Sequence, residues 1–219
     1  LFGYAHLPHI IKHQKLVERQ PIPDIPARAE LLTTAIAMLL EAGYVRVGFD
    51  HFARPGDPLA LAVESQTLHR NFQGFTVPLG GPLIATGITG ISESANAYWQ
   101  NIGDLEQWTK TVDDGHLPIA RGLVLSEEDH IRRYAINRLM CDSELTLSDI
   151  DERFGIDARS YFAYELETLQ SDKFTALANV DLDRGVVRPT ALGFELIRNV
   201  CMVFDSNLRG KEPSGSTTI

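Results

Sequence analysis

Three side chains that could bind or orient an acidic substrate lie close together between Asp50 and Pro55. Asp50 supplies a carboxylate, His51 an imidazole and Arg54 a guanidinium. The carboxylate could orient the imidazole or pair with Arg54, and a guanidinium can hold a carboxylate through two parallel hydrogen bonds. Ion-pair networks that only close a loop gather the same residue types, so a structural role stays open. We take Asp50, His51 and Arg54 as candidate catalytic residues.

A second segment, His69 to Phe75, mixes hydrogen-bonding groups with aromatic rings. The ring of Phe72 can stack on a flat ligand, and the amide of Gln73 can both donate and accept hydrogen bonds. Gly74 allows another backbone or a ligand to approach closely. The pattern suits a site for a planar ligand with a polar edge, although the aromatic residues could equally belong to a core.

Two other groups of residues give weaker signals. His6, His9 and His13 could suggest a metal, but Pro8 disfavours a helix that would align them, and no HExxH motif or nearby cysteine supports it. We therefore predict no metal site. The stretch from Gly87 to Gly90 lacks the Lys-Ser/Thr pair of a phosphate loop and the third glycine of a dinucleotide fingerprint.

Composition narrows the class of protein. The 219 residues carry a formal net charge of −9, which argues against nucleic-acid binding because that binding depends on Lys and Arg neutralising phosphates. No apolar stretch is long enough to span a bilayer, and no secretory signal is visible. The two cysteines are too few for a disulfide scaffold or an iron–sulfur cluster and favour a reducing, cytoplasmic location.

The elements expected around the first candidate segment form a parallel unit. Leu1 to Ala5 reads as a short buried strand, Ala27 to Ala42 as an amphipathic helix and Tyr44 to Phe49 as a second strand. His6 to Pro26 between them is expected to be a long loop with one helical turn. Strand, helix and strand predict a parallel sheet or barrel, in which Asp50 to Pro55 follow the functional end of a strand.

The rest of the chain is expected to be mostly helical. Ser126 and Asp129 form a capping-box pattern ahead of a helix, and Thr190 is expected to cap a last helix that runs to about Arg209. Gly210 to Ile219 are expected to be loose. The other expected elements are helices over 59–68, 104–112, near Ser148 and over 158–169, a strand or turn over 83–92, and a hairpin over 178–181 and 185–188.

The order of helices and hairpin in the second half predicts a winged-helix pattern. Such a pattern by itself suggests a DNA-binding module. Acidic residues outnumber Lys and Arg after Glu127, whereas a DNA-contacting domain is normally basic. We therefore expect this part to act in packing or as a lid rather than in nucleic-acid binding.

Four segments, taken together and in order, resemble one enzyme family over nearly the whole chain. They are Tyr4-Ala5-His6-Leu7-Pro8, Gly48-Phe49-Asp50-His51-Phe52-Ala53-Arg54-Pro55, His69-Arg70-Asn71-Phe72-Gln73-Gly74-Phe75 and Ile197-Arg198-Asn199-Val200-Cys201-Met202-Val203-Phe204-Asp205. The chain resembles the C-terminal part of the oxygen-independent coproporphyrinogen III oxidases, a radical S-adenosylmethionine family.

The resemblance implies a two-part fold. The family has an incomplete parallel β/α barrel followed by a helical domain, so residues 1–103 are expected to be the C-terminal part of the barrel and residues 104–219 the helical, winged-helix-like domain. The family binds its cluster with a CxxxCxxC motif in the N-terminal part, and this sequence contains none. The apolar start at Leu1, without methionine, also leads us to expect a truncated chain that is inactive alone.

The resemblance also implies an oxidative decarboxylation. In the family, two propionate side chains of coproporphyrinogen III become vinyl groups, which gives protoporphyrinogen IX in haem biosynthesis. S-adenosylmethionine and a reduced [4Fe–4S] cluster supply the radical chemistry, while the protein positions and shields them. The expected partners are the substrate coproporphyrinogen III and an electron donor for the cluster.

The family's cofactor contacts carry over to four positions. Phe72 and Gln73 match positions that contact a second S-adenosylmethionine, and Ala5 and Ile91 are expected to line the same adenosyl region. A related radical S-adenosylmethionine family acts instead as a haem chaperone, and the intact segment from His69 to Phe75 favours the oxidase. A non-catalytic substrate-lid or interaction fragment is a further alternative, because fold kinship does not settle function.

Overall fold

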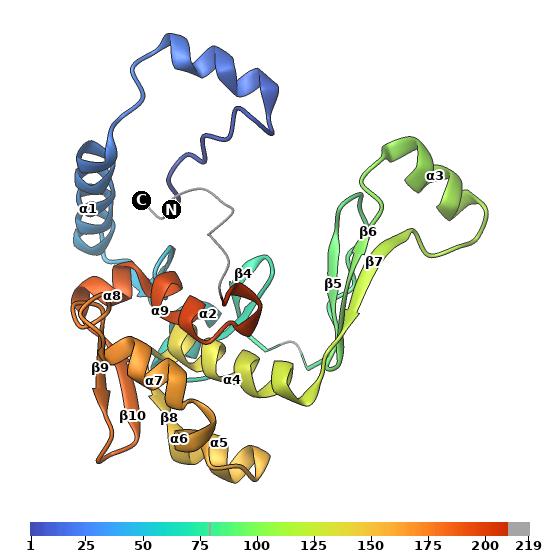
Figure 1. Cartoon of the computed structure of the whole chain (residues 1–219). Helices are drawn as coiled ribbons and strands as arrows, with labels where there is room; N and C mark the ends of the chain where they lie inside the picture. Colours follow the sequence, from blue (N-terminus) through green and yellow to red (C-terminus); the bar gives the residue numbers. More distant parts are fainter. Residues whose placement is uncertain (79, 210–219) are drawn as a thin grey trace.

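The chain combines helices with several small antiparallel sheets (Figure 1). The computed structural model describes residues 1–78 and 80–209. Its helices are η1 (Lys12–Arg19), α1 (Ile25–Glu41), α2 (Pro58–Glu64), α3 (Leu105–Asp113), α4 (Glu127–Asp142), α5 (Leu147–Phe154), α6 (Ala158–Tyr161), α7 (Ala163–Gln170), α8 (Ala191–Glu195), α9 (Ile197–Val203) and η2 (Ser206–Leu208). Its strands are β1 (Val45–Val47), β2 (His51–Ala53), β3 (His69–Asn71), β4 (Gly74–Thr76), β5 (Ile91–Glu93), β6 (Ala97–Asn101), β7 (Ile119–Val124), β8 (Leu145–Thr146), β9 (Ala178–Asp181) and β10 (Val186–Pro189).

The predicted parallel β-α-β unit is wrong for the residues described. The sheets are β1-β2, β3-β4, β5-β6-β7 and β8-β10-β9; their strand pairs are antiparallel, and no closed barrel appears in this part of the chain. After Val47 the chain turns straight back, because Gly48 adopts a φ of +59°, a left-handed conformation that favours glycine. Val47 then pairs with His51, so the strand after α1 belongs to a hairpin.

The expected buried strand at the start of the chain is also wrong. Leu1 to Ala5 form no strand, and the side chains of Phe2 and Tyr4 are largely exposed. The helical turn expected in the following loop is present as η1, a 3₁₀ helix. An apolar segment forms a strand only where another strand can pair with it, and among the described residues no strand pairs with Leu1 to Ala5.

The predicted helix over residues 27–42 is confirmed as α1. Its first turn is capped by Asp24, whose carboxylate accepts a hydrogen bond from the backbone N–H of Ala27 at 2.9 Å. Gly43 ends it with a φ of +84°. No residue of α1 is fully buried: Leu31 and Met38 are exposed, and the apolar face of Leu32, Ile36 and Leu39 is only partly buried.

The second half contains the larger apolar core. The Ser126–Asp129 capping box that starts α4 is confirmed, and so is the predicted hairpin, formed by β9 and β10. This core is made of buried residues from α4 to α9, with the rings of Phe162 and Phe204 packed edge to face at 5.2 Å. The last helix is broken at Leu196 into α8 and α9, so the predicted continuous helix from Thr190 is wrong.

The last helix is tightly packed at its start and is interrupted shortly afterwards. Thr190 caps α8 by accepting a hydrogen bond from the N–H of Gly193 at 3.0 Å. Gly193 lies so close to the backbone of Leu177 that a β-carbon there would overlap the Leu177 carbonyl. The chain then changes direction at Leu196 (φ −108°, ψ 30°) to bring α9 against α4 and α7. The expected loose tail, Gly210 to Ile219, lies outside the described residues.

A smaller core lies in the first half and meets the larger one at Phe49. The smaller core contains the buried residues Val47, Ala53, Ala60, Ala62, Leu68 and Phe75. Phe49 is partly buried and packs against both cores. A second link joins β1 to α8, where the guanidinium of Arg46 donates two hydrogen bonds of 2.7 Å to the carboxylate of Glu195.

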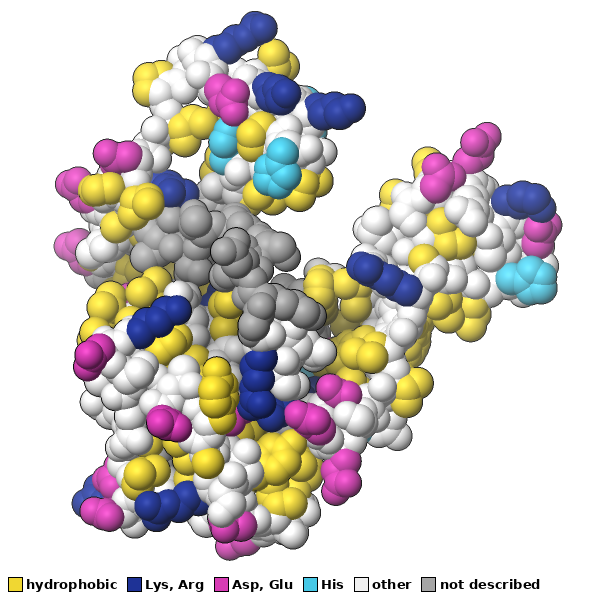
Figure 2. Space-filling model, viewed as in Figure 1, with side chains coloured by type: hydrophobic (Ala, Val, Ile, Leu, Met, Phe, Trp, Pro, Cys, Tyr) yellow, Lys and Arg dark blue, Asp and Glu magenta, His cyan; other side chains and the backbone are white. Residues whose placement is uncertain are grey.

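The sheet β5-β6-β7 and helix α3 form an arm that projects from the rest of the molecule (Figure 1). Every residue of β7 is exposed, and Figure 2 shows apolar side chains on the surface of the arm. Its base is attached to α4, where Arg133 lies 3.2 Å from the buried carboxylate of Glu93 on β5.

Candidate functional site

The predicted pair of Asp50 and His51 comes together at the β1–β2 hairpin. Asp50 ends the loop between the strands and is 4% exposed, while His51 begins β2. Nδ1 of His51 lies 2.5 Å from Oδ1 of Asp50. A carboxylate acceptor at Nδ1 favours a proton on that nitrogen and fixes the plane of the ring. Both residues border a hollow of about 440 Å³, which is also lined by Leu1, Phe2, Leu39, Tyr44 and Phe52.

Two arginines that were not among the candidate residues lie near the carboxylate of Asp50. Arg70 of β3 lies 3.9 Å from Oδ1, and Arg198 of α9 lies 3.8 Å from Oδ2. Burial lowers the pKa of the Arg70 guanidinium, and the negative charge of Asp50 opposes that change. Sequence reasoning missed both arginines as site residues, although both stood within the segments that carry the family resemblance.

Arg54, the third catalytic candidate, lies apart from this group. Its side chain is exposed, and the described residues show no ion pair to it. Its backbone carbonyl accepts a hydrogen bond from the N–H of Asp57 at 3.0 Å, in the turn that leads into α2. The structure therefore unites Asp50 with His51 but does not bring Arg54 to them.

Phe72 and Gln73 form the two-residue turn of the β3–β4 hairpin. The strands pair Asn71 with Gly74 across this turn, and the side-chain oxygen of Asn71 accepts a 2.8 Å hydrogen bond from the N–H of Gln73. Phe72 is 67% exposed, and the side chain of Gln73 is also exposed. The turn thus presents an aromatic face and an amide to the surroundings, while Phe75 behind it is buried.

His51 and the β3–β4 hairpin are in direct contact. Gly74 has a φ of +134°, and a β-carbon there would come within 2.9 Å of the His51 ring. The next residue, Phe75, packs edge to face on the same ring at 5.4 Å. The imidazole that Asp50 orients is therefore lodged against the backbone that follows Gln73.

The other two predicted cofactor contacts lie on separate segments. The backbone carbonyl of Ala5 accepts a 3.0 Å hydrogen bond from the side chain of Gln14, whose own oxygen accepts one from the N–H of Leu7 at 2.5 Å. Ile91 begins β5 and pairs with Gln100 of β6. The described residues record no hydrogen bond or ion pair from Ala5 or Ile91 to the turn of Phe72 and Gln73.

The exposed turn fits one part of the implied S-adenosylmethionine. An adenine ring offers a flat face and a hydrogen-bonding edge, which match the aromatic ring of Phe72 and the amide of Gln73. The described residues offer no comparable site for the iron–sulfur cluster. The described residues hold no group of three or more His, Cys, Asp or Glu that could ligate a metal, and His6 instead lies 3.1 Å from Glu18. Burial raises the pKa of both cysteine thiols, Cys141 to about 11.

No helix in the described part of the chain is both long and apolar enough to cross a membrane.

Comparisons with known proteins give consistent matches. The family described as HemN C-terminal domain matches residues 125–196. The chain is 36% identical to an oxygen-independent coproporphyrinogen III oxidase of Helicobacter pylori over 219 residues, which cover all of this chain and 48% of that protein. It is 39% identical to the enzyme of the same name from Pseudomonas aeruginosa, over 95% of this chain and 45% of the relative. The chain thus spans about half the length of the curated relatives it matches.

The fold gives the same match. A solved structure of the coproporphyrinogen III oxidase from Escherichia coli, described as a radical SAM enzyme, superposes with a TM-score of 0.86 at 38% sequence identity. The match covers 94% of this chain and 47% of that one.

Proposed function

We propose that this chain, whose sequence and fold match the C-terminal part of the oxygen-independent coproporphyrinogen III oxidases, is part of a longer enzyme that oxidatively decarboxylates coproporphyrinogen III. The product would be protoporphyrinogen IX. The observation that carries the proposal is the exposed turn of Phe72 and Gln73, held from behind by the Asp50–His51 pair. Such a turn is suited to binding an adenosyl group, and the similarity to named oxidases supplies the reaction.

In this proposal the residues of this chain bind the cofactor and the substrate and orient the groups around them. Phe72 would stack on the adenine of S-adenosylmethionine and Gln73 would hydrogen-bond its edge, while Ala5 and Ile91 would contribute small apolar contacts. Asp50 keeps the proton of the His51 imidazole on Nδ1 and fixes the ring against Gly74. Arg54 lies exposed on a separate turn, where a guanidinium could hold a substrate propionate through two hydrogen bonds.

The redox chemistry would come from outside this chain. S-adenosylmethionine, with a [4Fe–4S] cluster held elsewhere in the longer protein, supplies the radical chemistry of the decarboxylation. This sequence has two cysteines, too few to hold that cluster. The proposal therefore includes an electron donor for the cluster and predicts no activity for this chain alone.

We also propose a division of the fold into two parts. Residues 1–103 would complete an incomplete β/α barrel whose parallel strands lie elsewhere in the longer protein. Residues 104–219 would form a winged-helix-like domain, a reading supported by the helices α4, α5 and α7 beside the small sheet β8-β10-β9. β7 pairs with β6 across this boundary, so the arm made of β5, β6, β7 and α3 has strands on both sides of it. We also propose a cytoplasmic location.

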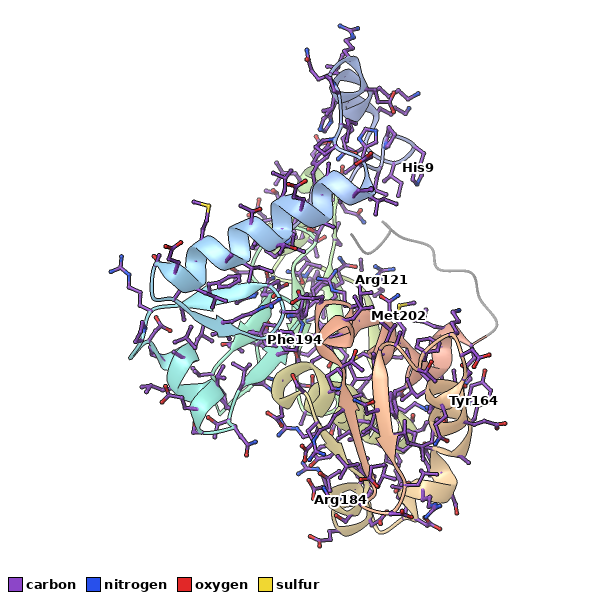
Figure 3. The ribbon with its side chains drawn as sticks, turned by 90° about the vertical axis from the view of Figure 1, so that its left-hand side faces the viewer. His9, Arg121, Tyr164, Arg184, Phe194 and Met202 are labelled. Atoms are coloured by element: carbon purple, nitrogen blue, oxygen red, sulfur yellow. The ribbon has the colours of Figure 1, made fainter. Side chains whose placement is uncertain are left out.

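The test uses the full-length protein with its cluster in place. Phe72→Ala and Gln73→Ala should each weaken S-adenosylmethionine binding, measured by equilibrium dialysis, by roughly tenfold, because a stacked ring or a paired amide contributes about 1–1.5 kcal/mol. Both positions are exposed, so thermal stability should stay unchanged. Tyr164→Ala is the matched control, since Tyr164 is an exposed aromatic residue on α7 (Figure 3).

Two results would count against the proposal. If the wild-type protein binds haem but forms no protoporphyrinogen IX from coproporphyrinogen III, the haem-chaperone alternative is favoured. If decarboxylation proceeds but neither variant changes S-adenosylmethionine binding, the enzyme assignment holds and the turn is not a cofactor contact.

A further inference from the structure

We propose that Arg198, on the C-terminal helix α9, is a positioning residue that acts through Asp50 and His51 on the turn of Phe72 and Gln73. The structure links these residues in one chain of contacts from the larger core to the exposed turn. The inference deepens the proposed function, because it gives the C-terminal helix a role in shaping the cofactor turn.

The carboxylate of Asp50 lies in a buried environment. Its side chain is 6% exposed, so its charge is removed from water and depends on nearby cations and donors. Those groups come from three different elements: His51 of β2, Arg70 of β3 and Arg198 of α9. A buried carboxylate shared in this way ties the two hairpins to α9.

The ring of Phe49, the residue before Asp50, contacts both arginines. The guanidinium of Arg198 lies 4.9 Å from the centre of this ring, and that of Arg70 lies 5.0 Å from it. Arg70 also lies 4.6 Å from the ring of Phe75. Cation–π contacts of this kind add to the ion pairs when the groups are partly desolvated. The position of Arg198 is therefore set both by the carboxylate and by the aromatic ring next to it.

His51 connects this cluster to the turn of Phe72 and Gln73. His51 is held by Asp50 at 2.5 Å and lies against Gly74 and Phe75. Gly74 follows Gln73 directly, so a shift of the imidazole changes the space available to the turn. A change at Arg198 can thus reach Phe72 and Gln73 without any direct contact between them.

An exposed ion pair alone would have little effect. Arg198 is 52% exposed and 3.8 Å from Asp50, and isolated surface pairs contribute almost nothing measurable. Here the partner is buried and Arg70 competes for the same carboxylate. Removal of Arg198 therefore changes the balance of charge around Asp50 rather than only a surface contact.

The experiment compares variants of the full-length protein in two measurements. Hydrogen exchange of the backbone amides from His69 to Thr76 reports the hairpin itself, and equilibrium dialysis reports S-adenosylmethionine binding. Arg198→Ala should speed exchange in the hairpin and weaken binding by about threefold to tenfold, the size expected for a mutation that modulates coupling between sites. Arg198→Lys, which keeps the charge, should restore part of the slow exchange in the hairpin and part of the S-adenosylmethionine binding.

Two comparisons decide whether Asp50 carries the effect. Asp50→Asn should give the same faster exchange, and the double variant Arg198→Ala/Asp50→Asn should be no worse than either single variant. If the effects of the two substitutions on exchange simply add, Arg198 does not act through Asp50, and the inference is overturned. Arg184→Ala is the control for loss of an exposed arginine, because Arg184 lies at the turn of the β9–β10 hairpin, away from Met202 of α9 (Figure 3).

The outcomes separate this inference from the proposed function. Unchanged exchange in Arg198→Ala overturns the inference even if the enzyme decarboxylates its substrate. Faster exchange with unchanged S-adenosylmethionine binding overturns the link to the cofactor. Faster exchange in a protein whose wild-type form binds no S-adenosylmethionine supports the positioning role and overturns the proposed function.

Discussion

The imidazole of His51 occupies the space that a side chain at Gly74 would need. A β-carbon built on Gly74 would lie 2.9 Å from Nε2 and from Cε1 of the ring, closer than real β-carbon contacts. The φ of +134° at Gly74 is also one that L-residues rarely adopt. The contact therefore needs glycine for two reasons: glycine has no β-carbon, and it tolerates this φ.

Gly74→Ala tests that contact. We expect it to lower the free energy of unfolding by about 2–4 kcal/mol, since the backbone strain of about 1–3 kcal/mol is joined by the clash with His51. Gly56→Ala is the matched control: its φ is +82°, but nothing lies within 4 Å of the added carbon. Urea denaturation of both variants gives the comparison. Equal costs would mean that His51 does not rest on Gly74.

The buried charges of Arg132 and Glu165 give a second prediction. Glu165 is fully buried, and its Oε1 accepts a 2.6 Å hydrogen bond from Nη1 of Arg132; Arg209 contacts the same oxygen. Arg132→Met should cost about 3–5 kcal/mol, because it removes the main partner of a buried carboxylate. The double variant Arg132→Met/Glu165→Met should cost less than the single one, measured by urea denaturation. A larger loss in the double variant would contradict this account.

Ser126→Ala gives a prediction that depends on pH. Hydrogen bonds from the side chain and then the backbone of Ser126 hold the pKa of Asp129 below its usual value of 3.8. A carboxyl group with a lowered pKa stabilises the folded state above that usual value, and the contribution is lost as the pH falls through the folded pKa. We expect Ser126→Ala to cost about 1 kcal/mol at pH 7. The difference from the wild type should shrink below pH 3.8.

The measurement is the free energy of unfolding of both proteins across the acidic range. Glu127→Gln in the same turn is the control for a general loss of acidic charge, because Glu127 takes no part in the capping box. A difference that stays constant down to the lowest pH would contradict the role of Asp129.

The two thiols should be unreactive in the folded protein. Burial raises the pKa of Cys141 to about 11, with a smaller contribution from Asp142, and burial raises that of Cys201 further. At pH 7.5 almost no thiolate is present, and the thiolate is the form that reacts. Iodoacetamide should therefore label neither cysteine in buffer and both in urea, as read by mass spectrometry. Rapid labelling of either in buffer would contradict the burial.

Local patterns predicted the capping box and the hairpin of the second half, although the expected helices over 158–169 and from Thr190 are each broken into two. The capping box at Ser126 and the hairpin of β9 and β10 depend on residues only a few positions apart, so the sequence carries their full signal. The start of α1 is similarly local, since Asp24 and Ala27 are three residues apart.

Features that depend on residues far apart in the chain could not be predicted from the sequence. Arg70 and Arg198 are separated by more than half of the chain, and only the fold brings both to Asp50. Leu1 to Ala5 have the composition of a strand but pair with no other strand among the described residues. Arg54 stands close to Asp50 in sequence, yet β2 lies between them, so the two residues are at opposite ends of that strand. The predicted roles of Ala5, Phe72, Gln73 and Ile91 stay predictions.

Phe49 belongs to the packing of both apolar cores, and this has a consequence for how the chain unfolds. Neither core can loosen around that ring without exposing apolar surface of the other. The ion pair between Arg46 and Glu195 opposes the same separation. The two halves are therefore coupled in free energy, and their core amides should share one cooperative opening event rather than two independent ones.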